Sequence, residues 1–567
     1  MLNILIASII SSIMILSAGI LFQYLFLGDK KNYIKFYESG IFGIIFLSFF
    51  SLFVNFFFPI NKMVGTFTLL IAVFYFIIIF LNSEKKRELL IIISSTALIS
   101  FIMVVFANIN RPDAGLYHLP YVSLINETKI VFGSVNIHAR FGHISILQYL
   151  SAIFNNYFFI IEFITLPLAS IFSFFLYFLF NRFLSSKNNL ERKITLVYFL
   201  IIIFSIYAFN RYSNYGNDIP AHIYFFILLI FFMEIKDIKI IKKNQFFKIL
   251  FVFIFLVTMK FYMILASLLV FLIFFYQKIK KELVLNKSFF LFLFFVFLWL
   301  SKNIISSGCL FYPITQTCFN SFKHFDKKTE IIANEGEAWA KAVVATKVKY
   351  KSHKEYNSDF MWLSTWKTTH LKKIEEKITP FIIFLTILLL LNIYKKSYSS
   401  NIKNIDAHYY KKIFIIVLFN LFCIFIWFVK FPLYRFGMSF LNAFLIFTFV
   451  YFFDIKNNIY NHKFFKKVMT IFLILGFIGF FGKNLYRIHY KNNQDYNNAP
   501  WPRIYTLDDT KKNISPIFKK VINFNDQTMF YYSSGKECMY SPSPCSNYQN
   551  QNLFMDLIYG YKFYYKK

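Results

Sequence analysis

Side chains capable of acid–base chemistry gather in residues 108–143, immediately after an apolar run. Asp113 lies within a few residues of the end of that run. The neighbours that could act with it are Tyr117, His118, Arg140 and His143. A carboxylate held there can deprotonate a hydroxyl or help to hold a metal ion. We take Asp113 as a candidate general base. The alternative is a helix cap or turn residue beside Pro112.

A second polar segment, residues 210–222, places another acid and another histidine between two apolar runs. Asp218 and His222 lie close together in this segment, so both are candidate substrate-binding residues. Asp218 also precedes Pro220 closely enough to cap the next helix. His222 fits a hydrogen-bonded interfacial histidine as well as it fits a ligand. Both interpretations stay open.

Basic side chains occur at three places where an apolar environment makes them costly. Lys260 interrupts a long apolar stretch, Lys302 lies near the end of another, and Arg435 follows a third. A basic residue at the centre of a membrane helix costs about 2.5–3.5 kcal/mol, so it usually faces a cavity or a partner. Near the interface, Lys302 and Lys430 could instead extend toward water. Several cations around one cavity predict an anionic ligand such as a polyprenyl phosphate.

The composition indicates which elements must position these groups. The chain has 567 residues, of which 57% are hydrophobic and 16% are charged. Its mean hydropathy is +0.53. These values exclude a soluble globular protein, a disordered chain and a small disulfide scaffold. The formal net charge of +33 would suit a nucleic-acid ligand, but the basic residues form short clusters between apolar runs. That arrangement is typical of the cytoplasmic loops of membrane proteins, so we expect no nucleic-acid partner.

The apolar runs predict an all-α polytopic membrane protein. They lie near residues 2–27, 39–60, 63–82, 89–108, 158–181, 194–209, 221–235, 288–305, 380–394, 413–429, 438–453 and 468–484. The first run is expected to be a retained helix rather than a signal peptide. Lysine clusters flank the stretch 249–277 on both sides, which predicts two short helices that turn near Lys260. We expect about fourteen crossings, because each span needs about 20 apolar residues.

The basic clusters and the cysteines predict which segments are external. If most clusters face the cytoplasm, four segments face outward: about 109–157, 210–220, 306–379 and the tail from 485. The paired cysteines lie in two of them, Cys309 and Cys318 in the third and Cys538 and Cys545 in the tail. Two disulfides would suit an oxidising compartment such as a periplasm. The alternative is four reduced thiols on a cytoplasmic face. The spacings are poor for zinc.

Residues from about 89 to 484 resemble the GT-C superfamily of multi-spanning glycosyltransferases, which includes protein mannosyltransferases and the aminoarabinose transferases of lipid A. Asp113 matches the acid that opens the first large external loop of that superfamily, before an interfacial helix. The turn with Lys260 and the Arg435-Phe-Gly sequence match its later basic elements. The sequence from Lys302 to Tyr312-Pro313 resembles the helix end that precedes a large external loop in bacterial members.

The resemblance implies a division into three parts. Residues 1–88 form additional N-terminal transmembrane helices. Residues 89–484 form the transmembrane catalytic core with external loops 109–157 and 306–379. Residues 485–567 form a small external, periplasmic C-terminal domain. The protein is expected in a bacterial cytoplasmic (inner) membrane as a multi-pass protein, with its active site facing the periplasm.

The resemblance also implies a reaction. A sugar on a polyprenyl-phosphate donor is transferred to a glycan, lipid or protein acceptor of the cell envelope. Asp113 is then the general base, Arg435 and Lys260 hold the donor phosphate, and His118 and Arg140 position sugar or phosphate. Because Ala114 follows Asp113, Asp218 would have to supply any second carboxylate. No cofactor is indicated with certainty; a divalent metal at Asp113 and Asp218 stays open.

Two other functions fit the same architecture. A polysaccharide polymerase or ligase would rely on external arginines rather than on Asp113. A lipid-linked oligosaccharide flippase or another transporter would have inverted repeats and interrupted helices near the middle of the membrane, and no clear repeat is present. The transferase interpretation requires Asp113, Lys260 and Arg435 to border one externally open cavity.

Overall fold

A computed structural model describes most of the chain, in which helices predominate and two small sheets follow. The described residues are 2–28, 34–105, 113–186, 192–209, 216–235, 237, 241–277, 285–347, 349–394, 407–453, 459–490, 504, 519–522, 528–533, 537–540, 543–548 and 552–566. The N-terminal helices are α1 (Leu2–Phe22), α2 (Phe36–Phe57), α3 (Lys62–Leu81), α4 (Lys86–Val105), α5 (Leu119–Glu127), α6 (Ile146–Ala152), α7 (Leu166–Ser185), α8 (Arg192–Ala208) and α9 (Asp218–Met233). The later helices are α10 (Lys243–Met259), α11 (Ser267–Gln277), α13 (Lys287–Ser307), α14 (Thr329–Ala340), α15 (His353–Ser358), α16 (Trp362–Trp366), α17 (Lys372–Tyr394), α18 (Ala407–Lys430), α19 (Tyr434–Phe452) and α20 (Ile459–Tyr490).

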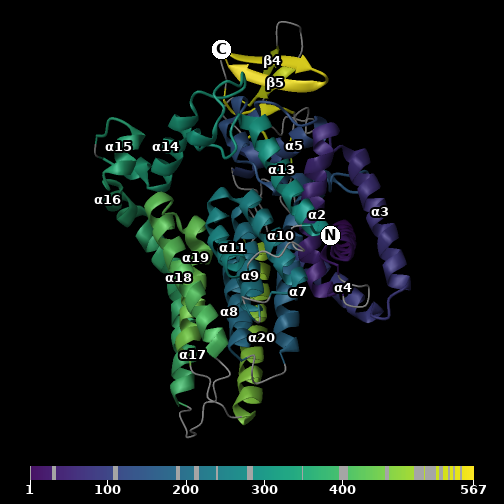
Figure 1. Cartoon of the computed structure of the whole chain (residues 1–567), viewed down its shortest axis with the longest axis vertical. Coiled ribbons are helices and arrows are strands. Elements are labelled where there is room, and N and C mark those ends of the chain that lie inside the picture. The colour runs from purple at the N-terminus through teal and green to yellow at the C-terminus, as the bar shows by residue number, and fades with distance from the viewer. Residues whose placement is uncertain are drawn as a thin grey trace.

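The strands of the described residues lie in the C-terminal part of the chain. They are β1 (Lys519–Ile522), β2 (Thr528–Tyr532), β3 (Cys545–Ser546), β4 (Leu553–Ile558) and β5 (Tyr561–Lys566). β2 pairs with β1 antiparallel and with β3 parallel, while β4 and β5 form an antiparallel hairpin. Figure 1 shows β4 and β5 at one end of the helix bundle, near α5. We call this the loop end.

Nine helices within the described ranges are long and apolar enough to cross a membrane. Three further apolar helices are shorter: Lys193–Ala208, Asp218–Met233 and Phe261–Phe275. The fold is therefore compatible with a multi-pass membrane protein. The expected count of about fourteen crossings is not confirmed, because several of the expected runs form helices shorter than the roughly 20 residues that a span needs.

The predicted break at Lys260 is confirmed. α10 ends at Met259, and Lys260 has an extended backbone with φ −147° and ψ 120°. A short 3-10 helix, Phe261–Ala266, then leads into α11. The break leaves the Lys260 side chain at the end of an apolar helix rather than along its face.

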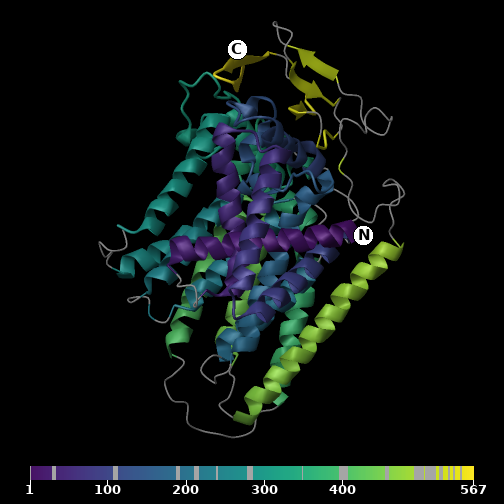
Figure 2. The same ribbon diagram turned by 90° about the vertical axis from the view of Figure 1, so that its right-hand side faces the viewer.

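The first helix packs crosswise on the bundle. Figure 2 shows α1 crossing the other helices at a steep angle, and it contacts α2, α3, α4 and α7. A Cβ atom on Gly19 would lie 1.7 Å from the carbonyl oxygen of Ser39, and one on Gly43 would lie 1.9 Å from that of Ile15. These glycines therefore allow the backbones of α1 and α2 to approach closely, as small residues do in membrane proteins.

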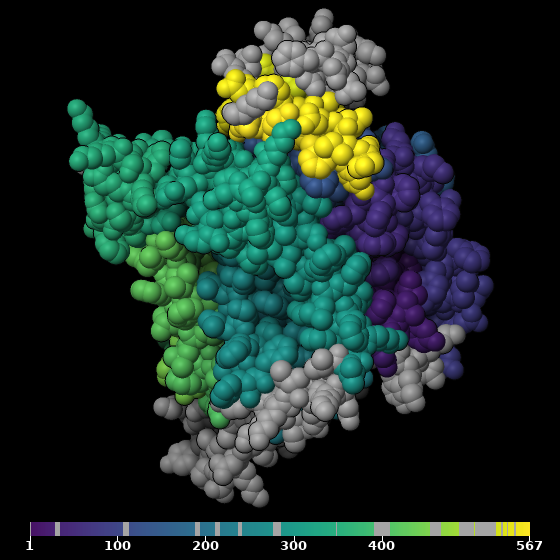
Figure 3. Space-filling model, turned by 45° about the horizontal axis from the view of Figure 1, so that its top comes forward, coloured from purple at the N-terminus to yellow at the C-terminus, as the bar shows by residue number. Residues whose placement is uncertain are grey.

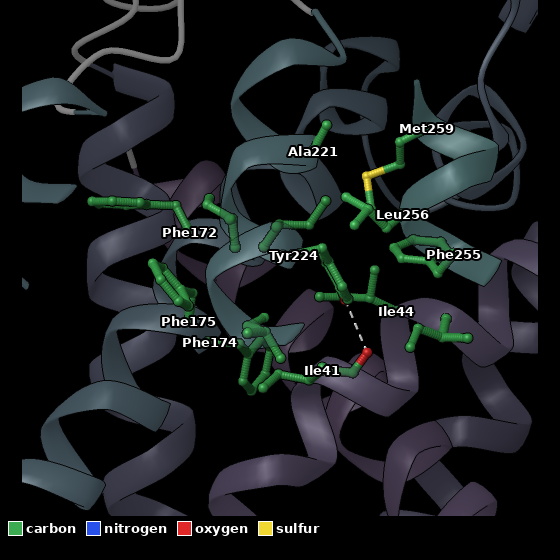
Figure 4. Close-up of a cluster of buried hydrophobic side chains, with 14 of the residues drawn as sticks. Ile41, Ile44, Phe172, Phe174, Phe175, Ala221, Tyr224, Phe255, Leu256 and Met259 are labelled. Atoms are coloured by element: carbon green, nitrogen blue, oxygen red, sulfur yellow. Dashed lines mark hydrogen bonds between the residues drawn. The ribbon is translucent and has the colours of Figure 1, made fainter. Parts of the chain in front are cut away.

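The core is centred on α9, whose residues 220–233 are all buried. A helix that is apolar on all sides belongs in the interior of a large helical protein. Figure 4 shows Tyr224 of α9 with Phe174 and Phe175 of α7 on one side and Phe255 of α10 on the other. The Tyr224 hydroxyl donates a hydrogen bond of 2.9 Å to the carbonyl of Ile41 on α2. At this level α9 therefore packs against α2, α7 and α10.

A buried cluster of charges joins five helices at the end opposite the loop end. Glu38 of α2 lies 2.8 Å from Arg182 of α7 and 2.6 Å from Lys248 of α10. Arg182 also lies 2.7 Å from Glu234, which follows α9. Tyr198 of α8 donates a hydrogen bond of 2.7 Å to Glu234. Each charge is thus compensated, as burial in an apolar bundle requires.

At the same end, lysines of the basic clusters donate hydrogen bonds to backbone carbonyls. These are carbonyls that the C-terminus of a helix leaves without a partner inside the helix. These contacts join Lys193 to Val450 and Tyr451, Lys412 to Met233 and Ile235, and Lys466 to Leu184 and Ser186. Lysines that were expected only to mark one membrane face therefore also close the ends of α19, α9 and α7.

The loop end differs from the expectation in one element. The apolar residues that recur at helical spacing from residue 144 onward predict an amphipathic helix lying on the surface, but the helix found there, α6, has only seven residues, all of them buried. This expectation was wrong because α2, α5 and α7 pack around α6 and remove it from the surface. Residues 306–371 contain α14, α15 and α16, and Figure 3 shows this region beside the C-terminal strands.

Replacing Glu38 by glutamine should destabilise the protein strongly, because Arg182 and Lys248 would lose a buried counter-charge. Removing one partner of a buried ion pair costs about 3–5 kcal/mol. The thermal unfolding midpoint of the purified protein in detergent should fall by several degrees. Glu330→Gln is the matched control, since Glu330 is 62% exposed and its ion pair with Lys354 spans 3.4 Å. Equal midpoints for both variants would contradict a stabilising role of the cluster.

Candidate active site

Asp113 and Arg435 meet at the loop end although they are far apart in the sequence. Arg435 Nη1 lies 3.7 Å from Asp113 Oδ2, and the two side chains are 42% and 41% exposed. Asp113 precedes a π-helical turn, Ala114–His118, and its side chain makes no capping hydrogen bond. The structure therefore favours an ion-pairing role for Asp113 over the cap interpretation.

Asp218 forms the second ion pair of the site. Lys260 Nζ lies 2.8 Å from Asp218 Oδ1, and each side chain is about a quarter exposed, 26% and 24%. The two cations share one aromatic ring. The Phe436 ring centre lies 5.6 Å from Lys260 Nζ and 5.0 Å from the Arg435 guanidinium carbon. The start of α9, the end of α10 and the start of α19 thus bring three charges together, with cation–π contacts to support them.

Tyr117 lies among these charges. The Arg140 guanidinium lies 5.4 Å from its ring centre. Burial, and then the charge of Asp113, raise the pKa of Tyr117 above its ordinary value. The phenol is therefore neutral at physiological pH and can donate a hydrogen bond. The charged groups that act on it are Asp113, Arg140, Asp218 and Arg435.

His118 is buried beneath the site rather than open to it. The amide nitrogen of Gln148 donates a hydrogen bond of 2.7 Å to His118 Nδ1, which makes Nδ1 the acceptor. The same amide group donates to Asn217 Oδ1 at 3.3 Å, next to Asp218. Burial, followed by the charge of Lys260, lowers the pKa of His118 to about 3. A neutral, buried imidazole tied to the start of α9 fits a positioning role better than the expected substrate contact.

His222 holds the start of α19 in place. Its Nε2–H donates to the backbone carbonyl of Arg435 at 2.8 Å, and its Nδ1 accepts from the Ser439 hydroxyl at 2.8 Å. Its side chain is fully buried. Of the two interpretations left open by the sequence, the structure favours the hydrogen-bonded histidine, and this histidine positions Arg435.

Lys302, His143 and Tyr312 lie at the contact between α13 and the first loop. Lys302 is fully buried and donates to the Ile144 carbonyl at 3.2 Å, so its geometry favours a structural contact. The His143 ring packs against Tyr312 with centres 5.1 Å apart. The His143 side chain is exposed, and the charged groups near it are Arg140, Lys260 and Lys302. His143 therefore borders the site, while Lys302 supports it from below.

Sequence reasoning missed two residues near the ion pairs. The Arg435 guanidinium lies 5.1 Å from the ring centre of Trp339, which is 44% exposed on α14. Glu537 of the C-terminal segment lies against Gly115, two residues after Asp113. The sequence offered a signal for Trp339, because this tryptophan lies in a segment rich in acidic residues. No local pattern indicates Glu537, because its position depends on how the C-terminal segment packs on the first loop.

The arrangement suits an anionic ligand better than a metal ion. No group of three or more histidine, cysteine or acidic side chains that could hold a metal occurs among the described residues. Asp113 and Asp218 each face a basic side chain, so their oxygens are already compensated. Arg435 Nε is buried and has no hydrogen-bond partner within the described part of the chain.

Two disulfides brace the loop end. Cys309 is bonded to Cys318, and Cys538 is bonded to Cys545. Cys423 on α18 is a buried free thiol. The first bond closes the turn after α13, and the second closes the segment that follows Glu537.

The fold and the charged cluster define the class: a helical protein with long apolar helices, compatible with several membrane crossings, that carries partly exposed ion pairs at one end. The chain belongs to the family described as domain of unknown function DUF8201, whose model matches residues 1–442. No curated protein and no solved structure matches the chain.

Alkylation of the protein in intact cells, before lysis, should label no cysteine of the two pairs. Disulfide bonds persist in an oxidising compartment, whereas cytosolic thiols stay reduced. Peptide mass mapping without reductant should find Cys309 joined to Cys318 and Cys538 joined to Cys545, and after denaturation only Cys423 should react. Labelling of all four paired cysteines would place the loop end in the cytoplasm.

Proposed function

We propose that the protein is a GT-C-like membrane glycosyltransferase. It transfers a sugar from a polyprenyl-phosphate donor to a cell-envelope acceptor on the outer side of a bacterial cytoplasmic membrane. The observation that carries the proposal is the convergence of Asp113, Asp218, Lys260 and Arg435 at the loop end. An acid and two cations that share an aromatic ring supply a base beside an anion-binding surface.

In this reaction the acceptor hydroxyl loses its proton to Asp113 as its oxygen bonds to the anomeric carbon of the donor sugar. The bond between that carbon and the phosphate oxygen breaks, and the phosphate leaves with the electron pair. Arg435 and Lys260 compensate the charge that develops on the leaving group. An exposed arginine can form the two parallel hydrogen bonds that a phosphate accepts.

Two further observations support the proposed orientation of the protein. The loop end carries both disulfides, which suit an oxidising compartment. The opposite end carries the lysines that close helix C-termini, and lysines concentrate on the cytoplasmic side of membrane proteins. Together they support a site that faces the periplasm.

Asp113→Asn should abolish sugar transfer in a deletion strain complemented with the variant. General-base catalysis contributes about 100- to 10,000-fold, so the envelope glycan should lack the sugar when examined by mass spectrometry. Asp359→Asn, at an exposed acid between α15 and α16, should restore the sugar at the wild-type level. Full restoration by Asp113→Asn at equal membrane abundance would contradict this mechanism and favour a polymerase, ligase or transporter.

Arg435→Gln and Lys260→Gln should each weaken the binding of polyprenyl phosphate to the purified protein in nanodiscs. A hydrogen bond to a charged group is worth about 1.5–3 kcal/mol, so each loss should be roughly 10- to 100-fold in Kd. Lys354→Gln removes a cation that is 75% exposed on α15 and should leave Kd unchanged. Unchanged binding by both test variants would mean that these cations do not hold the donor phosphate.

A further inference from the structure

A pocket of about 400 Å³ lies at the loop end, and none of the four residues of the two ion pairs lines it. Its walls are the first loop, the last turn of α13, the segment before α14 and the hairpin β4–β5, which lies over this end of α13 (Figure 1). Most of the lining is apolar and includes Ile304, Ile305, Phe322, Ile558 and Phe563. Pockets of this size and lining bind small molecules.

Contacts between the walls make the pocket part of the fold. The Tyr564 backbone N–H donates to the Phe132 carbonyl of the first loop at 2.9 Å. The Phe132 and Phe563 rings stack with their centres 4.0 Å apart. On the opposite wall, His324 Nε2–H donates to the Ile304 carbonyl of α13 at 2.9 Å. The hairpin, the first loop and α13 are therefore held in a fixed arrangement around the space.

The pocket continues the exposed apolar face of α13. This helix is among those that are long and apolar enough to cross a membrane. Phe290 and Phe297 are exposed on it. Ile304 follows Phe297 by seven residues, as Phe297 follows Phe290, and a step of seven residues turns a helix by only about 20° from a full repeat. In a membrane, a lipid chain along Phe290 and Phe297 would therefore reach the pocket at Ile304.

The turn of the hairpin also exposes apolar side chains at this height. Leu557, Ile558 and Tyr559 are all exposed. The Tyr561 hydroxyl donates to the Phe56 carbonyl near the end of α2 at 2.8 Å, and α2 is another helix that could cross the membrane. Exposed apolar patches mark interaction sites, and tyrosine is common at the membrane–water interface. The turn of the hairpin is therefore suited to contact with the membrane surface.

The polar part of the pocket carries one charge of each sign. Lys323 Nζ lies 2.9 Å from Asp556 Oδ2, and both side chains line the pocket and are exposed. The Tyr565 hydroxyl donates to Asp556 Oδ1 at 3.3 Å. An exposed ion pair is weak, so its members can turn to a ligand that also carries both charges. A phosphoethanolamine group has this character, with a phosphate for the lysine and an ammonium for the carboxylate.

We propose that this pocket binds phosphatidylethanolamine from the leaflet at the loop end. One acyl chain lies along Phe290 and Phe297, and its upper part fills the apolar space. The headgroup phosphate contacts Lys323, and its ammonium contacts Asp556. The lipid ties the hairpin, and through Phe132 the first loop, to the membrane. This inference goes beyond the proposed reaction, because it needs only that α13 crosses the membrane.

A photoreactive lipid tests where the chain lies. The full-length protein is placed in nanodiscs of phosphatidylglycerol that contain phosphatidylethanolamine with a diazirine near the glycerol end of one acyl chain. After illumination, peptide mapping should find labels on residues 304–305 of α13 and on residues 558–563 of the hairpin. Labels on the other exposed helices with none on the hairpin would overturn the proposal.

Two neighbouring residues of β4 supply a variant and its matched control. Ile558→Asp places a charge in the apolar lining and should lower the labelling of residues 304–305 roughly 10-fold. Leu557→Asp makes the same change at an exposed residue that does not line the pocket, and it should label like the wild type. Both variants should keep the wild-type thermal unfolding midpoint, because both side chains are exposed. Equal labelling of the two variants would contradict a chain in the pocket.

The host lipid tests the headgroup. Replacing phosphatidylglycerol by unlabelled phosphatidylethanolamine should lower the pocket labels roughly 10-fold by competition, as for a hydrogen bond to a charged group. Asp556→Lys should reverse this effect, because two cations then face one phosphate. Glu330→Lys makes the same charge change at an exposed acid on α14, outside the pocket, and should behave like the wild type. Equal labelling of the wild type in both host lipids would mean that the headgroup assignment is wrong.

Polyprenyl phosphate distinguishes the other source of a lipid chain. Added in an amount equal to that of the probe, it should leave the pocket labels unchanged. Loss of the labels would assign the pocket to the sugar carrier and overturn the phospholipid proposal. None of these measurements uses sugar transfer or changes Asp113, so the lipid site and the transferase can fail separately.

Discussion

Charge compensation inside an apolar bundle is the constraint on which the site depends. Glu38, Arg182, Glu234 and Lys248 can be buried only together, so they fix how α2, α7, α9 and α10 align at the end away from the loops. α9 runs from that cluster to Asp218, and a helix of its length spans roughly 24 Å at 1.5 Å per residue. The buried cluster therefore determines where Asp218 stands at the other end, and Lys260 at the end of α10 is placed in the same way.

The two ion pairs of the site differ in distance and in burial. Asp218 and Lys260 are 2.8 Å apart and about three-quarters buried, which suits a fixed element. Asp113 and Arg435 are 3.7 Å apart and about two-fifths exposed. Exposed pairs of this kind are worth about 0–1 kcal/mol, so a phosphate can displace Asp113 from Arg435 at little cost. Within the proposed mechanism, donor binding would then release the carboxylate that acts as the base, which couples the two steps.

The sequence singled out the charged residues that the structure brings together, but it did not indicate how the buried residues around them are placed. Asp113, Lys260 and Arg435 stood out because a charge next to an apolar run is costly wherever it lies. The same reasoning could not show that His118 and His222 form hydrogen bonds inside the protein. In the sequence, a histidine beside an apolar run looks the same whether it is buried and hydrogen-bonded or exposed to a ligand. The prediction of a surface helix at α6 was wrong for a related reason: helical spacing of apolar residues does not show whether other helices cover the polar face. The sequence did not indicate that Glu537 lies near Asp113 in the chain's fold, because its position depends on a hydrogen bond between the C-terminal segment and Gly115.

Long separation in the sequence also explains why no compact motif marks the site. Asp113, Asp218, Lys260 and Arg435 each lie at or beside the end of a different helix, and the core around Tyr224 brings those ends together. His222 shows how the core positions a charged residue of the site, because one buried side chain binds both the Arg435 carbonyl and Ser439. A change that loosens α9 against α19 would therefore move Arg435 without touching any charged group. The position of Arg435 at the loop end and the stability of the bundle therefore depend on the same helix contacts.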